Sequence, residues 1–207
     1  MAHIILLGDS IFDNLRYVRP EPDVAAQLRE LLPAGWKASL LAVDGSVTDD
    51  VDRQLAKLPA DATHLVLSVG GNDLLGYGEM LRTPVTTSAE AFFRLARAMD
   101  IFDSAYRRVV EASLKRGLPL VLCTIYNGNF ADQEFQTIAR VGVAAFNDVI
   151  LRLALEKGLY AIDLRLVCAL PEDYANPIEP SAIGGRKIAA AIWRTISDPN
   201  YIHKPEI

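Results

Sequence analysis

A serine directly follows the first apolar run of the chain. Residues 4–7 read Ile-Ile-Leu-Leu, and Gly-Asp-Ser follows at positions 8–10. A continuous apolar run is typical of a strand buried on both faces, and open parallel sheets bind ligands outside the carboxyl ends of their strands. Ser10, on a tight turn that a glycine begins, is therefore placed like a nucleophile.

Two further strand ends supply hydrogen-bond donors. Asp-Gly-Ser at 44–46 and Gly-Gly-Asn-Asp at 70–73 each follow another apolar run. Because parallel strands all end at one edge of a sheet, we expect the hydroxyl of Ser10, the backbone N–H of Gly45 and the side-chain amide of Asn72 to meet there. An acyl-transfer site needs these groups: a nucleophile and hydrogen-bond donors for the oxyanion that develops on the substrate.

The elements that must position these residues alternate along the chain. Five apolar runs predict strands, and segments of helical period predict the helices between them. This alternation predicts parallel βαβ units in a three-layer α/β/α domain with a five-stranded parallel sheet. The expected strands are 3–7, 38–43, 64–69, 119–126 and 159–164, and the expected helices are 24–32, 47–58, one starting at 88, 135–156 and one starting after the N-cap at 181.

Composition restricts the class of protein. The 207 residues fit one domain, 1–207, and 51% of them are apolar. A net charge of −5 and the absence of a basic cluster argue against a nucleic-acid partner. No apolar run approaches the roughly 18 residues of a membrane span, and no signal-peptide pattern opens the chain, so we expect a cytoplasmic protein. Without a Gly-x-Gly-x-x-Gly segment after the first strand, no dinucleotide cofactor is expected, nor any other cofactor.

The three polar segments together resemble the SGNH (GDSL-type) hydrolase family. The resemblance rests on Gly-Asp-Ser-Ile-Phe-Asp-Asn at 8–14, on Gly45 and on Gly-Gly-Asn-Asp at 70–73, and it extends from the first strand to the last helix. It implies a flavodoxin-like sheet of order 2-1-3-4-5. It also implies that Ser10 attacks an ester carbonyl, while the N–H groups of Ser10 and Gly45 and the amide of Asn72 form the oxyanion hole.

The family's catalytic base is replaced in this chain. Members usually carry Asp-x-x-His before the last helix, where this sequence has Asn176 and Glu179. The other histidines are poorly placed: His3 and His64 begin strands at the opposite edge of the sheet, and His203 lies beyond the last helix. We therefore expect Glu179 to accept the proton of Ser10, directly or through water.

A carboxylate is a weaker base than an imidazole, with an unperturbed pKa of about 4.3 against about 6.5. Burial would raise the pKa of Glu179, and a buried carboxylate needs a partner. Arg53, on the helix after Gly45, is the candidate. The alternatives are that Arg53 is a solvated charge on a helix face, and that Glu179 only interacts with the dipole of the last helix.

Three aspartates, Asp9, Asp44 and Asp73, come to the same edge and could suggest a metal ion. In the family that this chain resembles, the aspartate beside each block mostly shapes its turn, so no metal site is expected.

Two functions of different classes follow. The first is hydrolysis of a small-molecule carboxylic ester or thioester through an acyl-Ser10 intermediate, with Glu179 as base. The second is a non-catalytic binding protein that keeps the oxyanion hole but has lost the base. The loops 74–87 and 127–133 are expected to shape the pocket, while the substrate and the oligomeric state stay open.

Overall fold

A five-stranded parallel sheet forms the centre of the computed structural model, which describes residues 2–198. The strand order is β2-β1-β3-β4-β5, which confirms the predicted sheet. The strands are β1 (Ala2–Gly8), β2 (Trp36–Leu40), β3 (His64–Ser68), β4 (Leu120–Cys123) and β5 (Tyr160–Ile162).

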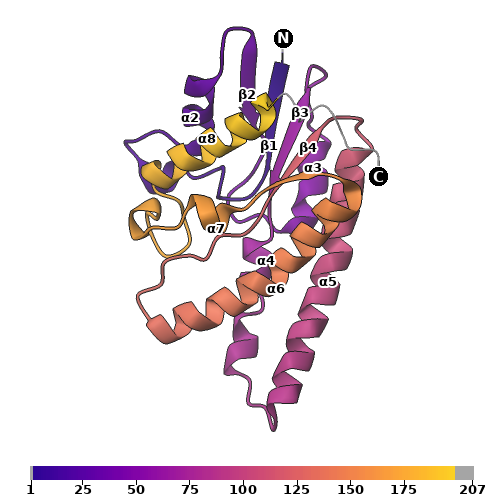
Figure 1. The fold of residues 1–207 in the computed structure, drawn as a ribbon, viewed down its shortest axis with the longest axis vertical. Coiled ribbons are helices and arrows are strands. Elements are labelled where there is room, and N and C mark those ends of the chain that lie inside the picture. Colours follow the sequence, from indigo (N-terminus) through magenta and orange to yellow (C-terminus); the bar gives the residue numbers. More distant parts are fainter. Residues whose placement is uncertain (1, 199–207) are drawn as a thin grey trace.

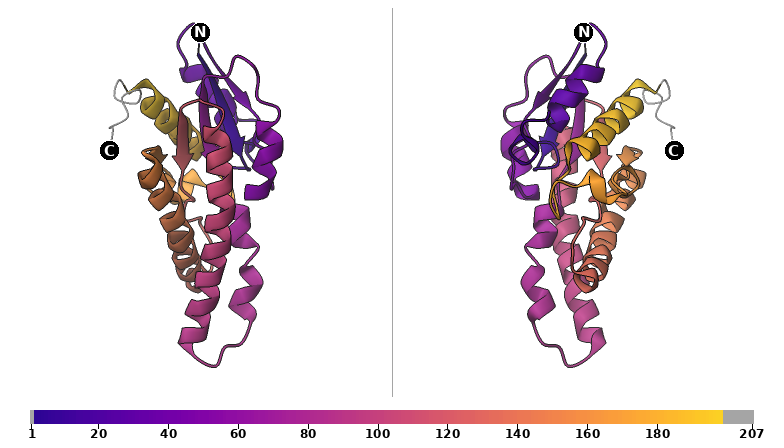
Figure 2. Two further views of the ribbon diagram at one scale, coloured as in Figure 1. Left: turned by 90° about the vertical axis from the view of Figure 1, so that its right-hand side faces the viewer. Right: turned by 90° about the vertical axis from the view of Figure 1, so that its left-hand side faces the viewer.

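Helices cover both faces of the sheet and complete the three layers (Figure 1 and Figure 2). One face packs against α2 (Val24–Leu31), α7 (Leu164–Val167) and α8 (Ala182–Ser197). The other packs against α3 (Val51–Leu55), α5 (Ser88–Leu114) and α6 (Gln133–Lys157). Short elements connect these layers: α1 (Leu15–Val18), α4 (Gly71–Leu75), and the 3-10 helices η1 (Thr48–Asp50), η2 (Gly78–Arg82) and η3 (Pro171–Asp173).

Successive side chains of β1 point to opposite faces of the sheet, so each face is covered by a layer of helices. Ile4 and Leu6 pack in the core on the α2 and α8 side, while Ile5 and Leu7 pack on the α5 and α6 side. All four side chains are fully buried. The continuous apolar run therefore reflects two cores, as expected of a parallel strand.

The capping residues fix where the long helices begin. Thr87 accepts a hydrogen bond from the N–H of Glu90 at the start of α5, and Ser181 accepts one from Gly184 at the start of α8. Such side-chain acceptors satisfy N–H groups that have no partner in the first helical turn. The predicted starts at 88 and after 181 are thus confirmed.

Several predicted boundaries differ from the structure. The fourth strand, expected at 119–126, is Leu120–Cys123, and the fifth, expected at 159–164, is Tyr160–Ile162. The second strand ends at Leu40 rather than 43, because the N–H groups of Leu41 and Ala42 both donate to the carbonyl of Leu6 and so interrupt the regular ladder. The predicted helix 47–58 is a 3-10 turn followed by α3, which ends at Leu55.

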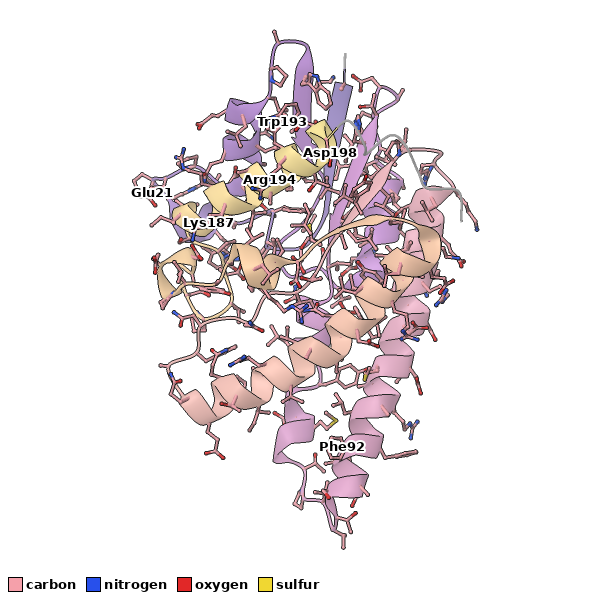
Figure 3. The ribbon with its side chains drawn as sticks, in the orientation of Figure 1. Glu21, Phe92, Lys187, Trp193, Arg194 and Asp198 are labelled. Atoms are coloured by element: carbon pink, nitrogen blue, oxygen red, sulfur yellow. The ribbon has the colours of Figure 1, made fainter. Side chains whose placement is uncertain are left out.

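The long helices α5 and α6 extend past the carboxyl edge of the sheet. With 27 residues, α5 is roughly 40 Å long, against roughly 17 Å for a five-residue strand. Their first turns project beyond the strand ends and diverge there (Figure 1). Phe92, near the start of α5, lies far from the sheet (Figure 3). Among residues 2–198, no helix is both long and apolar enough to cross a bilayer.

Candidate active site

Ser10 lies on the turn that leaves β1, with 8% of its surface exposed. Gly8 makes this turn possible, because its φ is +127° and a Cβ there would lie 1.7 Å from the carbonyl oxygen of Ser68. The carboxylate of Asp9 accepts the N–H of Ile11 at 3.1 Å and so closes the turn around Ser10. The local backbone therefore holds the serine at the carboxyl edge of the central strand.

The loop that carries Gly45 is hydrogen-bonded to the segments that follow β1 and β3. The N–H of Asp44 donates to the carboxylate of Asp13 at 2.9 Å. The side-chain amide of Asn72 donates to the carbonyl of Ser46 at 2.9 Å. Gly45 stands between these two bonds, so the three strand ends form one hydrogen-bonded unit.

Donor groups are left over in this unit. Asn72 uses one amide hydrogen for Ser46 and keeps a second. Within the described part of the chain, the backbone N–H groups of Ser10 and Gly45 have no protein acceptor. The arrangement therefore has three donors that a developing oxyanion could use.

Gln54 supports the same unit and was not identified from the sequence. Its side chain accepts the N–H of Gly8 and donates to the carbonyl of Gly8, both at 2.8 Å. It is 3% exposed and belongs to α3, the helix that follows the Gly45 loop. One feature of the sequence points to this role. Gln54 is a polar residue on the face of the helix that also carries the apolar residues Val51 and Leu55.

Glu179 is held in a loop that is fixed from three sides. The carboxamide oxygen of Asn176 accepts the N–H of Glu179 at 2.9 Å. The hydroxyl of Tyr126, after β4, donates to the carbonyl of Ile178 at 2.6 Å. The side chain of Asn14, in the same N-terminal block as Ser10, donates to the carbonyl of Pro180 at 3.1 Å.

The carboxyl group of Glu179 is unusual electrostatically. The residue is 4% exposed, and among the described residues its Oε2 atom has no hydrogen-bond partner. Loss of hydration raises the pKa of Glu179 to about 7, while an interaction with the Ser10 hydroxyl opposes the rise. Near neutral pH this carboxyl therefore exists in both protonation states.

Asp9 is a second buried carboxyl group at this edge. Burial, followed by repulsion from Glu179 and Asp73, raises the pKa of Asp9 to about 8, against the hydrogen bond from Ile11. At pH 7 Asp9 is mostly neutral, so Glu179 does not face a second full negative charge there.

Arg53 is not placed beside Glu179. Its side chain, on α3, is 82% exposed. It pairs at 3.3 Å with Asp50, which lies in the 3-10 turn before this helix. The cation that acts on Glu179 is Arg16, whose charge lowers the pKa of Glu179. Arg16 pairs with Asp44 at 3.0 Å.

The remaining candidates have other roles. His3 is the second residue of β1 and His64 the first of β3, so both lie at the opposite edge, and His203 lies outside the described residues. Asp73 accepts the N–H of Thr48 at 3.0 Å, and Asp44 is occupied by Arg16. No group of three metal-ligating side chains occurs between residues 2 and 198.

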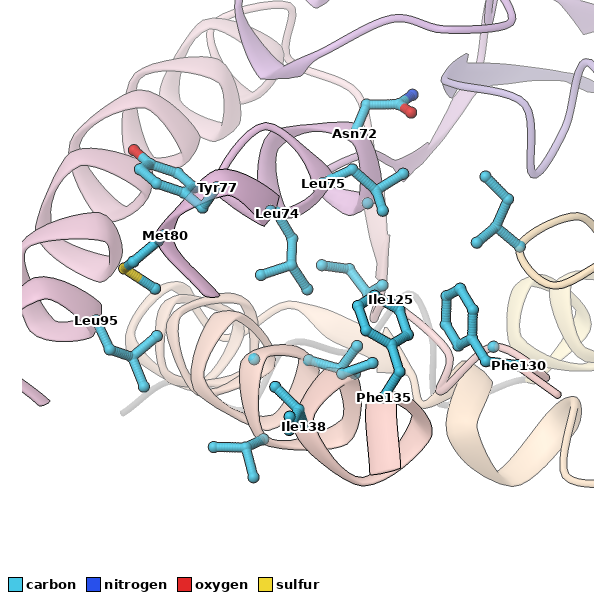
Figure 4. A pocket seen from close by; sticks show the side chains of 18 of the residues that line it. Asn72, Leu74, Leu75, Tyr77, Met80, Leu95, Ile125, Phe130, Phe135 and Ile138 are labelled. Carbon is cyan, nitrogen blue, oxygen red and sulfur yellow. The ribbon is translucent and has the colours of Figure 1, made fainter. Parts of the chain in front are cut away.

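A cavity of about 490 Å³ joins the serine and the glutamate. Ser10, Asn72 and Glu179 all line it, whereas Gly45 lies in the adjoining loop and Arg53 lies outside. Its other walls come from α4, η2, the segment 125–130 and the first turns of α5 and α6 (Figure 4). Most of these lining side chains are apolar, and they include residues of both predicted pocket loops, 74–87 and 127–133.

Comparison with known proteins assigns the class. The model of the GDSL-like lipase/acylhydrolase family matches residues 6–186. No curated protein matches the chain. The chain therefore belongs to this family of GDSL-type ester hydrolases.

Solved structures agree with this fold at low sequence identity. An extracellular lipase from Streptomyces rimosus has a TM-score of 0.67 and 16% identity, covering 93% of this chain and 98% of the lipase. A lipolytic G-D-S-L family protein from Veillonella parvula has a TM-score of 0.68 and 14% identity, covering 96% and 100%. The acetyl xylan esterase AlAXEase has a TM-score of 0.66 and 20% identity, covering 94% and 99%.

Proposed function

We propose that the protein hydrolyses carboxylic esters or thioesters through an acyl-Ser10 intermediate, with Glu179 as the general base. One observation carries the proposal: the buried carboxyl of Glu179 shares a cavity with Ser10, interacts with its hydroxyl and has a pKa of about 7. A base whose pKa lies near the working pH is suited to proton transfer. Burial thus offsets the weakness of a carboxylate relative to an imidazole.

The first half of the reaction transfers the acyl group to the enzyme. Ser10 Oγ attacks the carbonyl carbon while its proton passes to the carboxylate of Glu179. The carbonyl oxygen becomes an oxyanion, which the N–H groups of Ser10 and Gly45 and the amide of Asn72 stabilise. The intermediate collapses by breaking the bond to the leaving group, and that alcohol or thiol takes the proton from Glu179.

The second half returns the enzyme to its starting state. Water attacks the acyl-Ser10 carbonyl and gives a proton to Glu179. Collapse of this second intermediate releases the carboxylic acid, and Ser10 Oγ regains the proton. Asp9 is mostly neutral at pH 7, so it adds little negative charge at this edge of the sheet.

The experiment measures kcat/KM for p-nitrophenyl acetate and longer acyl esters between pH 5 and 9. For the wild type, kcat/KM should rise with pH through about 7, because protonated Glu179 cannot accept the serine proton. Ser10→Ala should lower kcat by at least about 10³-fold, and Glu179→Gln by about 10²–10⁴-fold with loss of the rise near pH 7. Glu172→Gln is the matched control, since Glu172 is an exposed carboxylate of the same segment.

Each outcome decides a part of the proposal. Activity that survives Ser10→Ala would exclude Ser10 as the nucleophile. An unchanged pH profile in Glu179→Gln would exclude Glu179 as the base. The double variant Asn176→Asp, Glu179→His should raise the rate if the base alone limits catalysis.

The competing function is a non-catalytic binding protein. The sequence difference at Asn176 and Glu179 favours it, since the family pattern has Asp and His there. Under this alternative the wild type binds esters without hydrolysing them, and Ser10→Ala changes neither property.

A further inference from the structure

We infer that the cavity beside Ser10 binds a medium or long apolar acyl chain, so that the preferred substrates are fatty-acyl esters or thioesters rather than acetyl esters. This inference rests on the proposed function, because it assigns the substrate of that same site. Its basis is the arrangement of polar and apolar side chains along the cavity walls.

The polar residues of the cavity fall at two separate places. Asp9, Ser10, Asn72 and Glu179 line it at the sheet edge. Thr83, Ser88 and Arg94 line it where η2 leads into α5, and Arg94 is paired with Glu90 at 2.6 Å. Apart from Tyr77 and Tyr126, the other side chains of the walls are apolar.

The intermediate stretch is continuous with the catalytic residues. Leu74 and Leu75 of α4 lie next to Asn72, and Ile138 of α6 lies across from them (Figure 4). Met80 and Leu95 stand at the end away from Phe130 (Figure 4). An acyl chain attached at Ser10 therefore has an apolar path leading away from the sheet.

The helices α4 and α6 pack together and form one wall of this path. Gly142 of α6 packs against α4 so closely that a Cβ would lie 3.1 Å from Leu74 Cδ1. The first turns of α6 and α5 then diverge (Figure 1) and leave the space that the cavity occupies.

The walls also expose apolar surface that an acyl chain would cover. Leu75 is 46% exposed, Val85 42%, Ile138 39% and Val141 55%, and all four line the cavity. Exposed apolar side chains gathered around one cavity indicate a binding site for an apolar group. Covering them removes apolar area from water on both partners.

The acyl side of the ester, rather than the alcohol side, is the favoured occupant. The acyl group is present in the transition states of both half-reactions, whereas the alcohol leaves after the first. Contacts with the acyl chain therefore act on both steps.

The experiment compares p-nitrophenyl esters from acetate to laurate with a second series in which the chain is on the alcohol, from ethyl to decyl acetate. Each methylene that enters the cavity should raise kcat/KM about fourfold. The increase should appear in the acyl series and level off when the chain reaches Thr83, Ser88 and Arg94. A flat acyl series, or an increase only in the alkyl acetates, would overturn the inference.

Variants then test the walls. Ala139→Phe places a ring in the cavity and should lower the ratio of kcat/KM for decanoate over acetate esters by at least about tenfold. Ile138→Ser, at an exposed helix position, should lower the same ratio about threefold to tenfold without filling the cavity. Ala144→Phe is the control, since Ala144 is exposed on α6 and does not line the cavity. If the ratio of kcat/KM for decanoate over acetate esters is the same in all three variants, the inference is wrong.

Binding without turnover separates this inference from the proposed function. Calorimetric titration of the Ser10→Ala variant with decanoate should show binding that Ala139→Phe weakens by at least tenfold. If esters are not hydrolysed but decanoate binds in this way, the apolar site stands and the proposed function fails. If esters are hydrolysed without regard to chain length and decanoate does not bind, the proposed function stands and the acyl site fails.

Discussion

The strand edge and the cavity beyond it are built by opposite means. At the strand edge, buried and half-buried polar groups hold one another: Gln54 bonds Gly8, Asp13 bonds Asp44, and Asn72 bonds Ser46. In the cavity, partly exposed apolar side chains of α4, α5 and α6 face a common space. In the mechanism proposed above, the first region fixes where negative charge develops on the substrate. In the acyl-site inference, the second region selects the group that is held next to that charge.

This difference predicts how the two regions respond to mutation. A change at the strand edge should act on every substrate, because every ester forms the same oxyanion. A change in the cavity should act only on substrates that reach it. Four predictions test this division.

The largest of these four effects is expected at Asn72. Asn72→Ala removes a donor to the oxyanion and should lower kcat by about 10²–10³-fold for acetate and decanoate esters alike. Steady-state kinetics with both esters checks this, beside Ala139→Phe, which should alter the ratio between them. If only KM rises, or if only the longer ester is hydrolysed more slowly, Asn72 acts in substrate binding by the cavity and not on the oxyanion.

The second prediction concerns the buried carboxyl of Asp9. Its pKa in the folded protein, about 8, lies above the unfolded value of 3.8, so the folded form holds the proton more tightly. The stability that this adds is full below the unfolded value and is lost as pH rises toward 8. Between pH 5 and pH 8 the loss is on the order of 3–4 kcal/mol.

Asp9→Asn should abolish that loss, because the amide accepts the N–H of Ile11 but does not ionise. Thermal melts at pH 5 and pH 9 measure the effect. The variant should gain much more in melting temperature at pH 9 than at pH 5, by roughly 2–4 °C for each kcal/mol. Equal shifts at both pH values would show that Asp9 is not held neutral by burial.

The third prediction compares the stability contribution of the two regions. Gln54→Leu leaves the buried N–H of Gly8 without an acceptor and should cost about 1–3 kcal/mol of unfolding free energy. Ile138→Ala, in the cavity wall at 39% exposure, should change it by less than about 0.5 kcal/mol. Urea unfolding of both variants measures this, and similar losses would remove the distinction between the regions.

The same division explains what the sequence could predict. Ser10, Gly45 and Asn72 follow strands whose ends must share one edge, so a strand pattern and three short motifs place them in the fold. After β2 ends at Leu40, the next residues still run beside β1, because their N–H groups donate to the carbonyls of Leu6 and Gly8. The error in the predicted end of the second strand therefore does not change the position of Gly45 at the edge of the sheet.

The sequence predicts the loops 74–87 and 127–133 at the pocket, but the cavity walls on α5 and α6 and the neighbours of Glu179 could not be predicted in this way. They depend on side-chain direction and on the angle between α5 and α6, which the helical period does not give. Arg53 shows the limit: its distance from Gly45 along the chain allowed it to reach the site, but its place on α3 pairs it with Asp50. Arg16, only six residues after Ser10, supplies the charge instead.

The smallest effect is therefore expected from these two arginines, which serve as each other's control. Arg16→Ala removes a positive charge that lowers the pKa of Glu179 and leaves Asp44, which raises it, without its ion pair. The pH at which kcat/KM reaches half its maximum should move up by a few tenths of a unit, because Arg16 is largely exposed and screened by water. Raising the salt concentration should reduce this shift. Arg53→Ala should leave the pH profile in place, and a shift with Arg53→Ala but not Arg16→Ala would restore the pairing that the sequence suggested.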